Sequence, residues 1–437
     1  MTMNRKSPNV ADGFSSHYLP LFWERQRQQW ENYTHNTHHD LNTIDSEIFS
    51  LVDTHRKLLT ENTINTHLMK KIVLREWIEK HPETAALRNK LDDRGHYITG
   101  SMPADPQELA RNIRLDVIRL MKLRNKLARS LQFETYPDLM LFTEDLSQSG
   151  LKSFLCSTLN AYLPEAHAII KHRNIKWTTW FDHLERMSSS VLHTVDDIHL
   201  SLWRKMGFPN DGNIKIISKQ QSIHGYAGIL NGARDIRILI RPVKTVHGVM
   251  VFLHELGHAA AHSMNRSQGL AQLWSAAYDE TMAMILQLLG CKILLENEMY
   301  QQTLEIGCLE TVRCTLSSLF EFKLWRSPEN GNDLYKKHFS RLGVDIGDDS
   351  LWVLDSFRSI DPVYIYTYVL GTKTARLVLQ KLETIYQERY ALWGKWLNDR
   401  FYADGWLRPL MVKLREAKID IPQLSGKAEA LQHPDRP

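Results

Sequence analysis

The stretch VMVFLHELGHAAAH, residues 249–262, is the most informative part of this chain. Its apolar first half predicts a helix that enters a hydrophobic core. Within this helix His254 and His258 are four positions apart, so both imidazoles lie on one face. This spacing allows the two histidines to bind a single Zn²⁺ and leaves Glu255 beside the open coordination position.

The pattern of these residues favours peptide-bond hydrolysis. Zinc can lower the pKa of a bound water from about 15.7 to about 7. A carboxylate next to that water can take its proton and pass it to a leaving amine, which makes Glu255 the candidate general base. An accidental match is the alternative, but the apolar residues before the motif and the small Gly257 and Ala259 after it indicate a buried, closely packed helix.

A catalytic zinc usually has three protein ligands and one water. Position 264 is Met, which excludes the class in which a third histidine follows ten residues after the first. Glu280 lies among small and apolar residues of the next predicted helix, and a buried carboxylate needs a metal or a partner. We therefore expect one Zn²⁺ per chain, held by His254, His258 and Glu280. An ordinary ion-paired glutamate is the alternative, and Asp279 is the second choice although it points about 100° away.

Four further side chains are candidates for the site. His262 follows His254 by about two helical turns and is a candidate for the substrate channel, although a hydrogen-bonded structural histidine is more common. Tyr364, Tyr366 and Tyr368 alternate: on a helix the first and last share a face, whereas in an extended segment all three do. A phenol can donate to a developing oxyanion. An aromatic packing cluster is the alternative.

Composition indicates an ordinary globular protein. Charged residues are 24% and hydrophobic residues 43% of 437, and the net charge is only +4, which gives no reason to expect nucleic acid as a partner. The four cysteines contain no CxxC pair and indicate reduced thiols in a cytoplasmic protein. We expect no signal peptide and no membrane span, because no apolar stretch is long enough.

The chain divides into four predicted regions. Residues 1–20 are expected to be loosely ordered, 21–205 to form a helical amino-terminal lobe, 206–420 to form the catalytic region, and 421–437 to form a polar tail. The helical prediction rests on the spacing of apolar residues. These regions predict a mainly helical fold.

Two short β-type runs lie before the HExxH helix, at residues 214–217 and 236–240. Gly225, Gly228 and the pair 231–232 are expected to supply turns between them. A small sheet is therefore expected next to the zinc-binding helix. An extended peptide could add to the strand at 236–240 through backbone hydrogen bonds.

The chain resembles the M3-type oligopeptidases, the group of thimet oligopeptidase and oligoendopeptidase F. The matching blocks occur in order over roughly residues 110–420: LRNKLAR (123–129), FETYPDL (133–139), DIRILI (235–240), HELGHA (254–259), Glu280 and YIYTYVLG (364–371). The resemblance implies a two-lobed helical bowl or clam with a deep substrate channel and a small sheet next to the zinc helix.

The resemblance also implies roles for individual residues. It makes Glu280 the third zinc ligand and Tyr368 the best candidate for the tyrosine that assists the transition state, with Tyr366 as the second candidate. The substrate is then a peptide, and the candidate substrate contacts are Ile238, Leu239, His262 and Tyr364. The sequence does not indicate an oligomeric state.

The chain departs from the family at three places. Position 261 is Ala where the family has His, position 287 is Gln where it has a second Glu, and residues 357–360 contain no counterpart of a family His and Tyr. These departures leave open a catalytically weakened zinc-binding scaffold or regulator, and a protease specific for one protein. Glu255 favours catalysis, because a site that only binds zinc does not need that carboxylate.

Overall fold

The computed structural model describes residues 10–425 except 36, 38, 58, 60–63, 93–104, 178–179, 210–211 and 221–223. The helices before the sheet are α1 (Val10–His35), α2 (Leu41–Arg56), α3 (Ile64–Glu79), α4 (Pro82–Asp92), α5 (Pro106–Ser130), α6 (Tyr136–Thr143), α7 (Gln148–Arg173), α8 (Trp180–Arg186) and α9 (Val195–Met206). Those after the sheet are α10 (Val246–Ser263), α11 (Ala276–Leu294), α12 (Asn297–Leu324), α13 (Gly331–Phe339), α14 (Tyr366–Tyr386), α15 (Tyr390–Leu397), α16 (Leu410–Glu416) and α17 (Pro422–Ser425).

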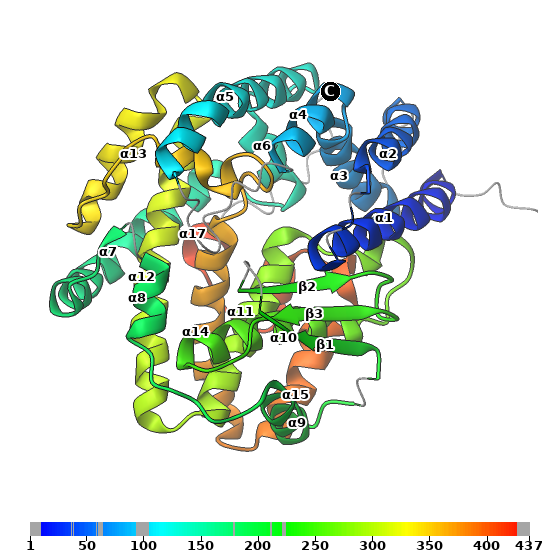
Figure 1. The fold of residues 1–437 in the computed structure, drawn as a ribbon. Helices are drawn as coiled ribbons and strands as arrows, with labels where there is room; N and C mark the ends of the chain where they lie inside the picture. The colour runs from blue at the N-terminus through cyan, green and yellow to red at the C-terminus, as the bar shows by residue number, and fades with distance from the viewer. Residues whose placement is uncertain are drawn as a thin grey trace, which may run out of the picture.

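A small sheet lies beside α10 (Figure 1). It contains β1 (Ile214–Ser218), β2 (Gly225–Ile229) and β3 (Ile236–Ile240) in the order β1-β3-β2. The central β3 is parallel to β1 and antiparallel to β2. The predicted fold, mainly helical with a small sheet next to the HExxH helix, is confirmed.

The strand β2 corrects the expectation that Gly225 and Gly228 form turns. Both glycines lie inside the strand, where neighbouring side chains approach too closely for a larger residue. A Cβ on Gly228 would lie 2.4 Å from the ring of Trp30, and one on Gly225 would lie 2.8 Å from Cγ of Glu255. The two glycines therefore let α1 pack on one face of the strand and α10 on the other.

Helix α11 packs between α10 and α14 at the centre of the molecule, and small residues set the separation of the helices. A Cβ on Gly257 would lie 2.6 Å from Cα of Ala283, so α10 and α11 are in backbone contact there. A Cβ on Gly371 of α14 would lie 3.2 Å from the carbonyl oxygen of Glu280. Thr245 and Ser275 cap the first turns of α10 and α11 with their hydroxyls.

Both ends of the described chain are more ordered than expected. Helix α1 begins at Val10, and Phe14 and Tyr18 are completely buried, because an apolar stripe packs on the neighbouring helices. Near the other end, Ile421 and Leu424 are buried. The expected loose segment is thus wrong for residues 10–20 and the expected tail is wrong for 421–425, whereas residues 1–9 and 426–437 lie outside the described part. The predicted boundary at 206 remains a prediction.

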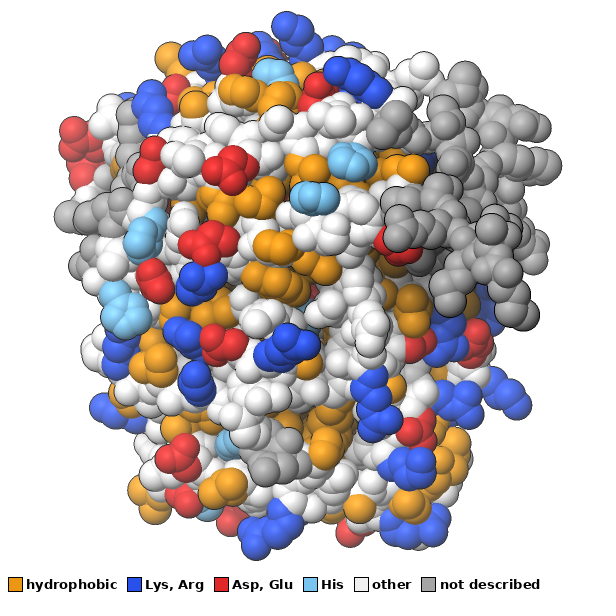
Figure 2. All heavy atoms as spheres, turned by 90° about the vertical axis from the view of Figure 1, so that its right-hand side faces the viewer, with side chains coloured by type: hydrophobic (Ala, Val, Ile, Leu, Met, Phe, Trp, Pro, Cys, Tyr) orange, Lys and Arg blue, Asp and Glu red, His pale blue; other side chains and the backbone are white. Residues whose placement is uncertain are grey.

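The surface carries charges of both signs, which alternate over the face seen in Figure 2. All four cysteines are free thiols; three are buried and Cys156 is exposed. In the part of the chain that the structure describes, none of the helices combines the length and apolar character that a membrane span requires.

Candidate metal centre and active site

The three predicted metal ligands, two histidines and one glutamate, lie close together at the centre of the molecule. Glu280 Oε2 lies 3.3 Å from Nε2 of His254, and Glu280 Oε1 lies 3.6 Å from Nε2 of His258. One potential ligand atom from each residue falls within 4.8 Å of the others. The two histidines come from one face of α10, and the glutamate from the helix that Gly257 holds in backbone contact.

The chemistry of this cluster suits a divalent cation. Glu280 is 2% exposed, and among the described residues its Oε2 atom has no hydrogen-bond partner. Burial alone would raise the pKa of Glu280, but the imidazoles of His254 and His258 lower it to about 2. A buried carboxylate without a full set of partners is costly unless a cation completes the site. Two imidazoles and a carboxylate are the ligand set of a catalytic zinc site.

Asp279 orients one of the histidines and is not placed as a ligand. Nδ1 of His258 donates to Oδ1 of Asp279 over 2.9 Å, which leaves Nε2 of His258 directed at Glu280. Neighbouring positions on a helix point about 100° apart. Asp279 therefore faces Nδ1 of His258, whereas Glu280 faces Nε2 and the metal cluster. A carboxylate behind a ligand histidine fixes its tautomer and ring orientation. From the sequence, Asp279 is expected only as an alternative ligand, and its partnership with His258 is not predicted.

His262 belongs to the same hydrogen-bonded network. Its Nε2 lies 3.2 Å from Oδ1 of Asp279, and its ring stacks on Trp274 with centroids 4.4 Å apart. The side chain is buried and is not among the residues that line the cavity described below. His262 is therefore a hydrogen-bonded structural histidine, the alternative that the sequence favoured. Its candidate role in the substrate channel is wrong, because it points into the core behind the ligands.

Glu255 lies at the wall of the cavity, beneath β2. Burial raises the pKa of Glu255, whereas His254, His258 and the backbone N–H of Ala227 act to lower it. A carboxylate whose pKa is raised is a better proton acceptor than one at its ordinary value. Gly225 supplies the space for this side chain.

The three tyrosines do not share one environment. Tyr364 donates a 2.5 Å hydrogen bond to Oε1 of Glu280, and the ring of Tyr368 stacks on His254 at 5.9 Å. Of the three tyrosines only Tyr368 lines the cavity. Tyr366 is buried, and Tyr364, which was expected to contact the substrate, is directed at Glu280 instead. Because α14 begins at Tyr366, the segment follows helical rather than extended spacing, and Tyr366 points away. Val363 before the helix adopts a φ of 59°, a strained conformation for a β-branched residue, and this turn presents Tyr364 to Glu280.

The strand expected to bind peptide is not available for pairing. β3 is hydrogen-bonded on both sides, and Ile238 and Leu239 are fully buried. The accessible edge on the side of Glu255 belongs to β2. At its two ends, Arg241 N–H donates to the carbonyl oxygen of His224 and Leu230 N–H donates to that of Asp235, so the even-numbered residues of β2 face β3. Residues 225, 227 and 229 therefore direct their backbone groups away from β3. The sequence does not predict this edge, because the glycines of β2 are typical of turns.

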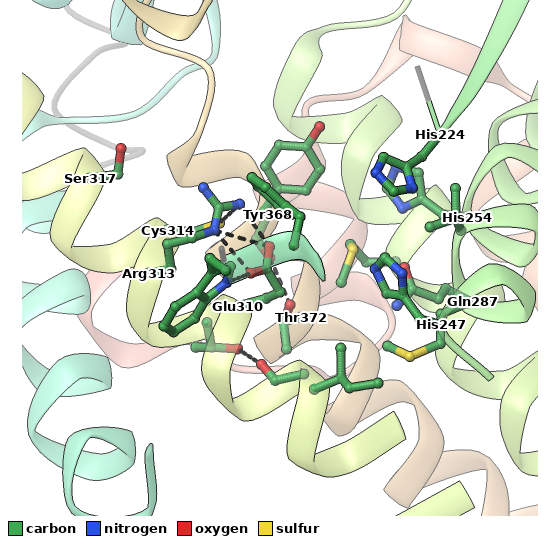
Figure 3. A pocket seen from close by; sticks show the side chains of 18 of the residues that line it. His224, His247, His254, Gln287, Glu310, Arg313, Cys314, Ser317, Tyr368 and Thr372 are labelled. Carbon is green, nitrogen blue, oxygen red and sulfur yellow. Dashed lines mark hydrogen bonds and ion pairs between the residues drawn. The ribbon is translucent and has the colours of Figure 1, made fainter. Parts of the chain in front are cut away.

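A cavity of about 670 Å³ opens at the metal cluster (Figure 3). Its walls are mainly apolar, and the aromatic and aliphatic residues include Trp177, Phe181, Met250, Met284, Leu288, Phe339 and Phe357. In Figure 3 His254 lies on one side, and the ion pair between Glu310 and Arg313, with Nη2 and Oε2 2.7 Å apart, lies on the other.

Two positions at which the sequence departs from the family pattern line this cavity. They are Gln287 and Phe357. The ring of Phe357 stacks on Tyr364, with centroids 5.6 Å apart and planes 7° apart, and it meets Tyr368 edge-on. The third departure, Ala261, is fully buried in α10. An apolar ring thus contacts both tyrosines of the site, and it comes from the segment that lacks a counterpart of the family His and Tyr.

No protein-family model and no curated protein matches the sequence. Solved structures do match over nearly its whole length. A putative oligoendopeptidase F aligns with 98% of this chain and 96% of its own, at 12% identity and a TM-score of 0.69. A putative oligoendopeptidase F from Bacillus anthracis str. Ames covers 96% of this chain and 87% of its own, at 11% identity and a TM-score of 0.62. A Pyrococcus furiosus carboxypeptidase covers 96% of this chain and 97% of its own, at 14% identity and a TM-score of 0.61. The chain therefore has the fold of M3-type peptidases, as the resemblance of its motifs predicted.

Proposed function

We propose that the chain is a zinc-dependent peptidase that hydrolyses short peptides. The observation that carries the proposal is the convergence of His254, His258 and Glu280 beside Glu255 on the wall of a ligand-sized cavity. When bound, Zn²⁺ would polarise the scissile carbonyl and lower the pKa of a bound water to about 7. The peptidase fold supports the same assignment.

The side chains around the cluster have separate roles in this proposal. Glu255 takes a proton from the attacking water and delivers it to the leaving amine. Tyr368, whose ring lies against His254, donates its hydroxyl to the oxyanion that develops on the carbonyl oxygen. Tyr364 and Asp279 are positioning residues, because they hydrogen-bond to Glu280 and His258 respectively.

The cavity indicates the class of substrate. Its volume of about 670 Å³ lies within the range of small-ligand sites, so it accommodates a few residues of an extended chain rather than a folded protein. The edge of β2 that faces away from β3 offers backbone groups of residues 225 and 229 to such a chain, while the N–H of Ala227 is directed at Glu255. This mode of binding tolerates many sequences. The apolar walls favour an aromatic or aliphatic side chain next to the scissile bond. We therefore expect oligopeptides with large apolar residues to be cleaved.

The experiment is to incubate the zinc-loaded protein with a diverse peptide library and to identify the products by mass spectrometry. Glu255→Gln should keep the zinc and abolish the products, since it preserves size but removes the base. Glu280→Ala should lose most of the catalytic zinc, measured by elemental analysis. Turnover by Glu255→Gln within a few-fold of wild type, or full catalytic zinc occupancy in Glu280→Ala, contradicts the proposal.

A zinc-binding scaffold or regulator is the second candidate, and Phe357 is the observation that favours it. This ring contacts both Tyr364 and Tyr368, and the segment 357–360 to which it belongs has no counterpart of the family His and Tyr. The library experiment separates the two functions. A wild-type protein that holds zinc through Glu280 but forms no product from any peptide is a binding protein.

A further inference from the structure

A second cluster of potential metal-binding side chains lies beside the same cavity, and its two histidines, His224 and His247, line the wall. Glu185 is at the end of α8, His224 precedes β2, and His247 is in the first turn of α10. One potential ligand atom from each of the three lies within 4.8 Å of the others. Nδ1 of His247 is 3.0 Å from Oε1 of Glu185, and Nδ1 of His224 is 3.8 Å from the same oxygen.

The second cluster repeats the chemistry of the first. Each contains two imidazoles and one glutamate, and the corresponding nitrogen–oxygen distances in the first cluster are 3.3 and 3.6 Å. We propose that Glu185, His224 and His247 form a second binding site for a divalent cation such as Zn²⁺. Nothing in the catalytic proposal requires this site, so the two can be tested separately.

The hydrogen bonds around Glu185 leave one oxygen for a cation. Oε2 of Glu185 accepts a 2.6 Å hydrogen bond from the hydroxyl of Thr245, which in turn caps the first turn of α10. Oε1 faces the two imidazoles. For Nδ1 of His247 to bind a cation, the neutral imidazole must carry its hydrogen on Nε2 instead of donating it to Oε1.

The protonation states agree with this geometry. Burial, together with Arg241 and His247, lowers the pKa of His224 to about 4, although Glu185 and Asp182 act in the opposite direction. Burial alone would raise the pKa of Glu185, but its hydrogen bonds and the neighbouring imidazoles lower it to about 2. Two imidazoles and one carboxylate are the side-chain types that bind zinc, and it is the placement of their ligand atoms within 4.8 Å of one another that carries the proposal.

The second site is too far from the first to take part in the chemistry. His247 and His254 are seven residues apart on α10, which corresponds to about 10 Å along the helix. Two metals that share one reaction lie about 3.5–4 Å apart. Figure 3 shows His224, His247 and His254 on the same side of the cavity, and three protein ligands leave a coordination position open to it.

A cation at this position would connect three elements that flank the active site. It would tie the end of α8 and the residue before β2 to the first turn of α10. Because β2 packs over Glu255, the expected effect is to fix the strand edge to which a peptide would pair. Occupancy of this site should therefore stabilise the fold even when the catalytic site holds no metal.

The experiment counts bound zinc per chain after equilibrium dialysis against micromolar Zn²⁺. We expect two ions in wild type, one in His224→Ala and one in Glu280→Ala. The double variant that combines these two substitutions should bind none. His183→Ala, on the same helix as Glu185 but outside the cluster, is the matched control and should retain two. Zinc should also raise the Tm of Glu280→Ala but not that of the double variant.

Folding of each variant is checked by circular dichroism, and Glu185→Gln should lose the same ion as His224→Ala. Equal zinc content in wild type and a folded His224→Ala overturns the proposal, as does loss of both ions from that variant. If Glu280→Ala binds two ions and His224→Ala binds one, the second site is supported and Glu280 is not a ligand of the catalytic zinc. The two proposals thus fail in distinguishable ways.

Discussion

Tyr366 and Tyr368 are two positions apart but lie in different parts of the molecule. The ring of Tyr368 stacks on His254 at the cavity, whereas Tyr366 is buried behind it. We expect Tyr368→Phe to lower kcat by about 10²-fold, the cost of one oxyanion donor. KM should change little, since the hydroxyl acts in the transition state.

Tyr366→Phe is the control for this change and should leave kcat at the wild-type value, measured with the best peptide from the library. A large loss in Tyr366→Phe with none in Tyr368→Phe would mean that the helical placement of this segment is wrong. If both variants are fully active, the two tyrosines are packing residues and have no role in catalysis.

Asp279 should affect the metal without binding it. Asp279→Asn keeps the size of the side chain but removes the charge that holds Nδ1–H of His258. Loss of such a partner typically weakens metal binding about 10–100-fold. Competition with a chelator measures this affinity. Asp399→Asn, at an exposed pair with Lys395, serves as the control and should bind zinc as wild type does.

At the scale of elements, Gly257 sets the separation of α10 and α11. In Gly257→Ala the new Cβ would lie 2.6 Å from Cα and 2.8 Å from the carbonyl oxygen of Ala283, and backbone atoms cannot rotate away. The helices must move apart, which we expect to cost about 1–3 kcal/mol of unfolding free energy. The zinc affinity should fall as well, because His258 and Glu280 sit on the two separated helices.

Urea unfolding and chelator competition test both effects of this substitution. Gly13→Ala in α1 is the matched control, since no atom lies within 4 Å of its added Cβ. It should stabilise the protein by roughly 0.5–1 kcal/mol through helix propensity. Unchanged stability and metal affinity in Gly257→Ala would show that the two helices are not in tight contact.

At the scale of the whole molecule, Asp45 joins the amino-terminal helices. Its carboxylate is fully buried on α2 and lies 2.6 Å from Arg25 of α1, 2.7 Å from Lys80 after α3 and 3.2 Å from Arg88 of α4. Asp45→Asn removes the nearest anion of all three cations, and only Lys80 and Arg88 keep a more distant carboxylate, so we expect the free energy of unfolding to fall by about 3–5 kcal/mol. Glu47→Gln, exposed on the same helix, should change it little, and urea unfolding compares them.

The same carboxylate makes stability depend on pH. Burial would raise the pKa of Asp45, but Lys80, Arg25 and Arg88 hold it well below its usual range. An unfolded aspartate has a pKa of about 3.9, so below about pH 4 the unfolded chain binds a proton that the folded one does not. The stabilisation is complete above this range and is lost as pH falls. Wild type should therefore lose stability on acidification more steeply than Asp45→Asn, and equal slopes would contradict the assignment.

The sequence by itself determined the features that depend on local pattern. The helical spacing of apolar residues predicted the mainly helical fold, and the β-branched runs at 214–217 and 236–240 predicted two of the three strands. The four-residue spacing of His254 and His258 places both on one helix face whatever surrounds it. The burial of Glu280 followed from its apolar neighbours.

The tertiary structure alone decided what lies between segments distant in the chain. The strand β2 is stable although it contains two glycines, because Trp30 and Glu255 fill the space beside them. In the folded chain Asp279 accepts a hydrogen bond from His258. Residues 185, 224 and 247 lie close together although they are far apart in the sequence. The spacing of apolar residues indicates which face of a helix or strand is buried, but not which other element packs on that face. These contacts are set by packing between segments far apart in sequence, and a local pattern contains no information about them.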